Sequence, residues 1–281
     1  MLSLFKAFLF RLVRDMTFRI TVIIGVGLAL LMTGLYGLLG YISEGSIAML
    51  TGENMLVGSL SPAQNFGIAI PVNLISFTVI EFMHGTIRNK IIAGNSKGKI
   101  YASLFLSGLV FSILLIVMYA SLCFLLGTIF GGFHPDNGSG GLLGGTSFNS
   151  IYLIRMVIAG LMSYVSITSL AVLFSTLFRN IGGTIPIVIL SIFGCYLISL
   201  LPSMIGSLSD NGDLKVFLDV LRIVNPLYAI SAQEMSIDPD TGKTSLVMSD
   251  LTFISTIINN LVYAALFFVA GLFIFKKRDV K

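Results

Sequence analysis

The stretch Glu81–Tyr101, EFMHGTIRNKIIAGNSKGKIY, interrupts a chain that is apolar on both sides of it. It carries a histidine, one carboxylate and four cations. Of the 281 residues of the whole chain, 56% are hydrophobic and only 11% are charged, and the mean hydropathy is +0.97. Because a soluble domain carries roughly 25% charged residues, the sequence predicts an integral membrane protein in which this stretch connects two spans.

Six apolar runs are long enough to cross a bilayer as helices, which takes about 20 residues. Their bounds are Ile20–Ile42, Ala63–Ile80, Ile100–Gly131, Ile151–Phe178, Ile181–Ile205 and Leu251–Phe275. The second run is the weakest, because it contains Gln64, Asn65, Pro71 and Asn73. All six are continuous rather than alternating, which favours helices over a β-barrel. We therefore predict an all-α membrane protein with six transmembrane helices in a single domain, residues 1–281.

Positive charge collects on one side of the predicted membrane. The two ends of the chain and the second and fourth loops hold 13 cations and 3 acids, a net charge of +10, whereas the other loops hold 4 cations and 10 acids, a net charge of −6. Since cytoplasmic loops are rich in Lys and Arg, both termini are predicted to be cytoplasmic, in a multi-pass protein of the cell membrane. Topology thus explains the basic balance, and no nucleic-acid partner is expected.

The segments that precede the first and the last predicted span have distinct sequence patterns. Residues 1–18 contain apolar side chains at helical spacing with cations among them, and they are too short to span. This pattern predicts an interfacial elbow helix on the cytoplasmic leaflet, with a disordered basic tail as the alternative. A cleaved signal peptide is disfavoured, because its apolar core has only 7–15 residues. Residues 206–250 are predicted to form an extracellular or re-entrant region, with an amphipathic helix over Leu214–Val224.

Two of the predicted spans carry small residues at helical spacing. The first span has Gly25, Ala29, Thr33 and Gly37, and the fifth has Gly183, Ser191 and Cys195. Such stripes let helices approach closely in lipid. They are typical both of packing within one chain and of a seam between two subunits of a dimer, and the sequence leaves both interpretations open.

Motifs for catalysis, nucleotides or metals are missing from the sequence. The segment TGKT, Thr241–Thr244, lacks the glycine that a phosphate loop needs five residues earlier, and DPDTG, Asp238–Gly242, does not match a calcium loop. His84 and His134 stand alone. We therefore predict a chain that is not an enzyme and holds no metal or cofactor. Because the apolar runs contain almost no ionisable residues, any transport is expected to draw its energy from outside the chain.

Within the opening stretch, the pattern predicts a two-turn helix, Ile87–Ala93, about 10 Å long. Thr86 is expected to cap this helix and Gly94 to end it. Ile87 and Ile91 form an apolar edge. A helix this short is marginal in water, so we expect it to dock on a partner; the alternative is a basic loop that lies on lipid.

The segment EFMHGTIRNKIIAGNSKGKIYASL, Glu81–Leu104, resembles the loop between the second and third spans of ABC-2 type permeases of Gram-positive bacteria. That loop has an acidic residue, then G-T-[IL]-[RK]-N-K, then a short Ser/Lys/Arg stretch. The likeness is specific over about 25 residues, while the six spans and the basic N-terminal helix agree more generally.

This resemblance implies the membrane subunit of an ATP-driven exporter in the peptide and antimicrobial export group. Residues 84–98 would form its cytoplasmic coupling loop, seated in a separate ABC ATPase that binds ATP and Mg. The coupling residues implied are Glu81, Gly85, Thr86, Ile87, Arg88, Asn89, Lys90 and Ile91. A second permease subunit, identical or different, and membrane lipids would be the other partners. The substrate expected is amphipathic, a peptide in the first place; the alternatives are an ATP-independent carrier or channel and a non-transporting sensor or immunity protein.

Overall fold

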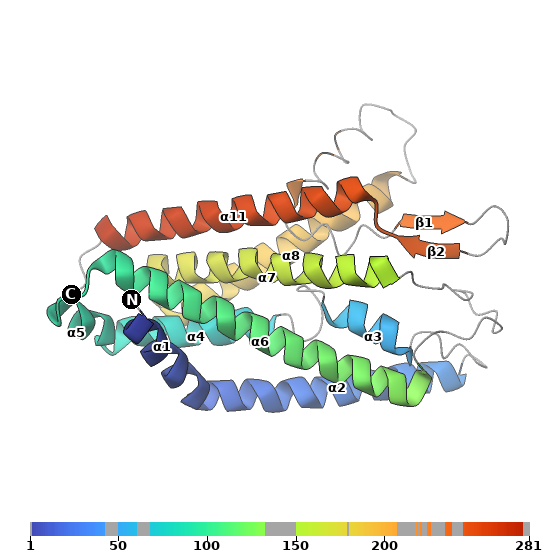
Figure 1. The fold of residues 1–281 in the computed structure, drawn as a ribbon, viewed down its shortest axis with the longest axis horizontal. Helices are drawn as coiled ribbons and strands as arrows, with labels where there is room; N and C mark the ends of the chain where they lie inside the picture. Colours follow the sequence, from blue (N-terminus) through green and yellow to red (C-terminus); the bar gives the residue numbers. More distant parts are fainter. Residues whose placement is uncertain are drawn as a thin grey trace.

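The chain folds into an elongated helical bundle (Figure 1). The computed structural model describes residues 2–42, 50–60, 68–132, 150–178, 180–206, 217, 220, 224–225, 234–237 and 244–277. Its helices are α1 Leu2–Arg14, α2 Met16–Ile42, α3 Gly52–Ser59, α4 Ala69–Met83, α5 Thr86–Ile92, α6 Lys97–Gly131, α7 Ser150–Phe178, α8 Ile181–Gly206 and α11 Asp250–Lys277. Two strands, β1 Glu234–Ile237 and β2 Thr244–Val247, form an antiparallel pair.

Five helices are long and apolar enough to cross a membrane: α2, α6, α7, α8 and α11. They coincide with five of the six predicted spans, so the prediction of a helical, multi-pass membrane protein is confirmed at this level. Large apolar side chains on these helices face outward, among them Ile23, Leu190 and Phe273. In water such a surface would be unfavourable, whereas a bilayer covers it without cost.

The second predicted span, Ala63–Ile80, differs from the other five. Helix α4 begins only at Ala69 and has 15 residues, about 22 Å at 1.5 Å per residue, which is short of the roughly 30 Å hydrocarbon core. It forms a possible span only together with α5, from which it is bent by 56°. Helix α3 lies in the other half of the bundle, beside α6 (Figure 1). The predicted run thus corresponds to α4 only from Ala69 onward, and residues 63–67 lie outside the described residues.

The bundle has two distinct ends. Helices α1 and α5, the start of α6 and the last turn of α11 lie at one end, called here the α5 end (Figure 1). The strand pair and α3 lie toward the other, called the hairpin end. Both α1 and the last turn of α11 are thus at the same end of the bundle.

The strand pair departs from the all-α fold class; for residues 206–250 the sequence predicted an extracellular or re-entrant region without strands. Glu234 lies opposite Val247 and Ile237 opposite Thr244, and both strands include β-branched residues, which favour strands over helices. Of the helix predicted over Leu214–Val224, three residues are described and helical: Phe217, Val220 and Val224. The rest of that segment lies outside the described residues.

Hydrogen bonds between helices hold the interior of the bundle. The Ser166 hydroxyl of α7 donates to the side-chain oxygen of Asn260 in α11 at 2.7 Å, and Thr168 donates to Ser112 of α6 at 2.9 Å. Asn73 of α4 donates to the main-chain oxygen of Thr17 in α2 at 2.8 Å. Since transmembrane helices gain little from hydrophobic burial against each other, such bonds and close packing fix their arrangement.

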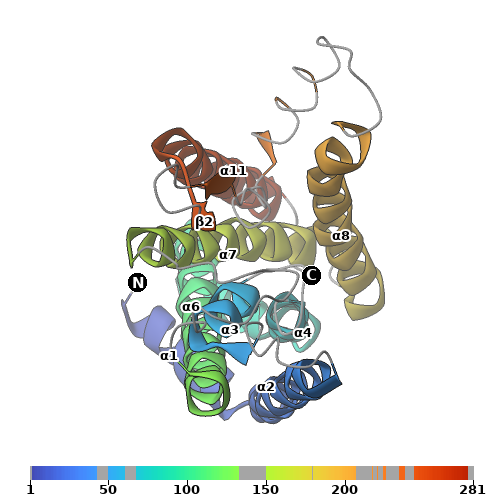
Figure 2. The ribbon, with the colours of Figure 1, turned by 90° about the vertical axis from the view of Figure 1, so that its right-hand side faces the viewer.

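The first small-residue stripe packs within the chain. Gly25, Ala29 and Thr33 of α2 are buried, and Gly37 is half-buried. This burial agrees with packing within one chain, because buried residues cannot contact a second subunit. The second stripe, Gly183, Ser191 and Cys195 of α8, is only half-buried. Figure 2 shows α8 at the edge of the bundle, and for this stripe both interpretations stay open.

Candidate functional site

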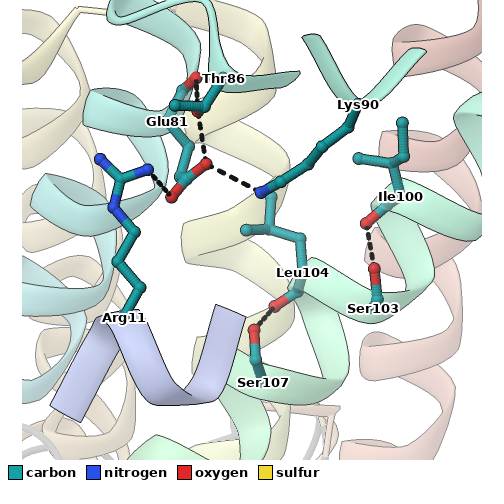
Figure 3. A network of polar contacts seen from close by, with 8 residues as sticks. All are labelled: Arg11, Glu81, Thr86, Lys90, Ile100, Ser103, Leu104 and Ser107. Carbon is teal, nitrogen blue, oxygen red and sulfur yellow. Dashed lines mark hydrogen bonds and ion pairs between the residues drawn. The ribbon is translucent and has the colours of Figure 1, made fainter. Parts of the chain in front are cut away.

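Glu81 is a fully buried carboxylate, 0% exposed, near the end of α4. Its Oε1 atom lies 2.9 Å from Nη1 of Arg11 in α1, and its Oε2 atom lies 3.1 Å from Nζ of Lys90 in α5. The Thr86 hydroxyl donates to Oε2 at 2.5 Å and to the Glu81 main-chain oxygen at 2.7 Å. Figure 3 shows these side chains converging from three helices. One carboxylate thus joins α1, α4 and α5 at the α5 end.

Lys90 has an aromatic neighbour as well as an acidic one. Its Nζ atom lies 3.3 Å from the centroid of the Phe8 ring, a cation–π contact with a buried residue of α1. Burial lowers the pKa of the Lys90 ammonium, and the Glu81 carboxylate beside it opposes that shift. Phe8, Arg11, Glu81, Thr86 and Lys90 together are called here the Glu81 cluster.

The backbone around α5 depends on two glycines. Gly85 has φ +66° and lies between α4 and α5, and Gly94 has φ +85° just after α5. This left-handed region is open to glycine at no steric cost. The chain can therefore bend by 56° after α4, make two turns of helix and leave again toward α6. Asn95 closes the exit, since its main-chain N–H donates to the Lys90 oxygen at 3.2 Å.

Three predictions about this stretch need correction. Thr86 was expected to cap the short helix, but its hydroxyl bonds Glu81, and the N-cap position belongs to Gly85, with α5 running over Thr86–Ile92. Ile87 and Ile91 were expected to form an edge for a partner, but Ile87 is 0% exposed and Ile91 packs against the core. Lys90 lies against Glu81 and Phe8 rather than facing outward.

The face of α5 that points away from the bundle consists of other residues. Arg88, Asn89 and Ile92 are exposed, Ile92 by 73%. Met83, at the end of α4, is 64% exposed and adds a second apolar side chain. His84, which lies between α4 and α5 in the chain, is also exposed. These five residues are called here the α5 face; they comprise one cation, one histidine, one amide and two large apolar side chains, on α5 and the end of α4, and the Glu81 cluster lies on the opposite side of α5.

A second buried carboxylate, Glu53, was missed by sequence reasoning, which assigned it to an outer loop. It lies in α3 and is 0% exposed. Helix α3 can pack deeply because α6 presents glycine to it: a Cβ atom added to Gly127 would lie 3.0 Å from the Gly52 Cα atom. Ionisable residues inside membrane bundles are rare and often functional. The glycine at position 127 was the available signal, since it permits close approach of a neighbouring helix.

At the hairpin end, Arg155 of α7 forms an ion pair with Asp250 of α11. It also donates to the main-chain oxygen of Met248 at 2.6 Å. Arg155 thus joins the starts of α7 and α11. Within the described part of the chain, no three His, Cys, Asp or Glu side chains gather in a way that could hold a metal ion.

Long apolar helices, a basic α5 end and a buried interhelical carboxylate define a multi-pass helical membrane protein. Residues 19–281 match the family model described as "Protein of unknown function (DUF2705)", so the chain belongs to that family. No curated protein and no solved structure matches the chain.

Proposed function

We propose that this chain is the membrane subunit of an ATP-driven exporter and that the α5 face is the surface on which a separate ABC ATPase docks. The observation that carries the proposal is the Glu81 cluster. It holds a two-turn helix that would be marginal alone, while leaving Arg88, Asn89 and Ile92 exposed. The resemblance of Glu81–Leu104 to the corresponding permease loop supports the same assignment.

The Glu81 cluster also suits the transmission of force. A push on α5 reaches α4 through Thr86 and Lys90, and it reaches α1 through Arg11 and Phe8. Packed elements move as units rather than deforming continuously. ATP-driven closure of two ATPases would therefore move α4 together with α1 in each of two permease subunits.

Charge supports the orientation of the proposed subunit, and the sequence motifs support its energy source. The α5 end carries the excess of cations, which supports a cytoplasmic location for it. ATP and Mg would bind to the partner ATPase, because this chain has no Walker motif. Interior Ser, Thr and Asn side chains, rather than charged ones, favour an amphipathic substrate, and we propose a peptide moved outward.

A negative charge placed on the α5 face tests the docking surface. The variants Arg88→Glu and Ile92→Glu are expected to weaken co-purification of a Walker-motif ATPase at least tenfold, because exposed anchor residues dominate binding energy. Arg19→Glu is the matched control, since Arg19 is an exposed cation at the same end but outside α5. All three variants should insert into the membrane normally. Equal ATPase recovery from the control and the α5 variants would exclude this face as the docking site.

A second candidate function, an ion-coupled carrier, is favoured by one observation, the burial of Glu53 in α3. A buried carboxylate is the usual mark of proton or cation coupling. The two functions differ in their energy source. Transport into sealed vesicles that persists without ATP, collapses with a protonophore and is lost in Glu53→Gln would support the carrier, whereas strict ATP dependence would support the exporter.

A further inference from the structure

Helix α3 lies in the interior of the bundle at its hairpin end, where Figure 2 shows it among α2, α4, α6 and α7. Of residues 50–60, none is exposed; Asn54, Leu56 and Gly58 are half-buried and the others are buried. The helix packs mainly on α6 and also on α7. Because no side of α3 is exposed, the helix closes the bundle interior against entry from the hairpin end.

Helices α3 and α4 lie beside successive parts of α6. A Cβ atom added to Gly131, at the hairpin end of α6, would lie 2.6 Å from the Leu50 main-chain oxygen. One added to Gly108 would lie 2.9 Å from the Cδ1 atom of Leu74 in α4. These two glycines are about 34 Å apart along α6 at 1.5 Å per residue. Helix α3 thus supplies, toward the hairpin end, the length that α4 lacks for a hydrocarbon core of roughly 30 Å. The arrangement is that of one broken crossing, with α3 as its outer half and α4 as its half at the α5 end.

Glycines allow α3 to approach its neighbours closely. A Cβ atom added to Gly127 of α6 would lie 3.0 Å from the Gly52 Cα atom, and one added to Gly160 of α7 would lie 3.0 Å from the Leu60 Cβ atom. The Gly52 main-chain N–H also donates to the main-chain oxygen of Gly132, just after α6, at 3.0 Å. Gly127 and Gly160 are called here the glycine seat of α3.

Away from this seat, α3 has little to keep it helical. It has only eight residues, and two of them are glycines, Gly52 and Gly58, so it would be marginal in isolation. Its neighbours α6 and α7 are continuous helices of 35 and 29 residues. Elements that move in function are drawn from those of low local stability. Beside these two long helices, α3 is therefore the element suited to move.

We propose that α3 is a gate at the hairpin end, which opens the bundle interior when it leaves the glycine seat and closes it when it returns. The break between α3 and α4 allows the outer half of the crossing to move alone, because α4 is tied to α1 and α5 through Glu81. Packed elements of this kind move as units between discrete positions. The inference rests on the proposal that the chain transports a solute, but not on the ATPase or on the energy source.

Thiol labelling of the purified full chain in lipid nanodiscs tests the gate, with a membrane-impermeant maleimide as the probe and both native cysteines replaced by alanine. The reporter is Ser163→Cys, at a position that is 0% exposed and one turn beyond Gly160 toward the α5 end. A disulfide between Leu60→Cys and Gly160→Cys locks the gate, since their Cβ atoms would lie 3.0 Å apart, within about 1 Å of the separation in a disulfide.

We expect the reporter to be labelled slowly in the unlocked chain. The lock should slow this labelling by roughly tenfold or more, because labelling of a buried thiol follows the population of the open form, and reduction of the disulfide should restore it. Mass spectrometry identifies which cysteine is labelled. The matched control is Thr78→Cys in α4, also 0% exposed, which should stay unlabelled whether or not α3 is locked.

Three results would overturn the proposal. The first is no labelling of Ser163→Cys in the unlocked chain, which would mean a static α3. The second is labelling that the lock does not slow, which would mean entry by another route. The third is equal labelling of Thr78→Cys, which would mean general unfolding.

If the cysteine pair does not fold, the glycine seat decides. Gly127→Val should speed the labelling of Ser163→Cys, whereas Gly34→Val, where nothing lies within 4 Å of an added Cβ, should not; equal rates would refute the gate. None of these measurements involves an ATPase. Their failure would leave the docking of an ATPase on the α5 face untouched, and a failure of that docking would leave the gate untouched.

Discussion

Glu81→Ala is expected to destabilise the chain by about 3–5 kcal/mol, the typical cost of removing one partner from a buried ion pair. The Lys90 ammonium would remain largely buried beside Phe8 without its carboxylate, and the Thr86 hydroxyl would lose an acceptor. The share of Arg11 is smaller, because its side chain is 45% exposed and solvent screens it. Helices α1 and α5 should separate from α4, and trypsin should then cleave at Arg88 before global unfolding.

Two further variants serve as comparisons for Glu81→Ala when stability is measured by thermal unfolding and limited proteolysis. Glu81→Gln keeps hydrogen-bonding atoms but loses the charge, so a smaller loss is expected. Asp250→Ala removes a carboxylate that is paired with Arg155 but 79% exposed, and exposed pairs contribute only about 0–1 kcal/mol. The interpretation of Glu81 as the joint of three helices would be wrong if Glu81→Ala and Asp250→Ala unfolded together at the wild-type temperature.

Gly127→Val is expected to displace α3 from the bundle and to cost about 1–3 kcal/mol or more. The new Cβ would lie 2.9 Å from the Met55 Cγ atom and 3.0 Å from the Gly52 Cα atom. The second of these is a backbone atom, which can move only if the whole of α3 moves. The same substitution at Gly34 of α2, where nothing lies within 4 Å of an added Cβ, should be tolerated.

Labelling of a single cysteine measures the displacement of α3. In a chain whose Cys195 is replaced by alanine, a cysteine at Ser59, 2% exposed, should resist a thiol reagent. Cys123 is buried and should remain silent. With Gly127→Val added, Ser59→Cys should be labelled. Protection that survives this substitution would show that the close approach of α3 to α6 does not depend on the glycine.

Length and apolarity were sufficient to locate five spans. The predicted run Ile181–Ile205 and helix α8, Ile181–Gly206, differ by one residue at the end, and the ends of the other four runs lie within four residues of the helix ends. The run Ala63–Ile80 is the exception, because α4 covers it only from Ala69 onward and residues 63–67 lie outside the described residues. Whether α4 and α5 form one bent span depends on the 56° bend between them, which composition does not show. The packing of α3 on Gly127 was also not predicted, because a contact between residues more than 70 apart is not visible in local sequence.

The sequence predicted several residues of the candidate site but not how they are arranged in space. Glu81, Thr86 and Lys90 were singled out by the motif, whereas Arg11 and Phe8 were not connected with them. Which side of a two-turn helix faces the bundle depends on the 56° bend after α4. That bend turns Ile87 and Lys90 inward and leaves Ile92 exposed. The strand pair β1–β2 was missed because its two segments are only four residues each.

Site-specific cross-linking from the α5 face tests the central proposal most directly. A cysteine at Ile92, 73% exposed, carries a photoactivatable cross-linker in a chain with Cys195→Ala, and membranes of the native host are irradiated. The account predicts one major cross-linked protein that carries a Walker motif and hydrolyses ATP, and its loss when Arg88→Glu is added. Cross-links to lipid alone, or to proteins without a nucleotide site, would contradict the assignment of α5 as the contact with an ATPase.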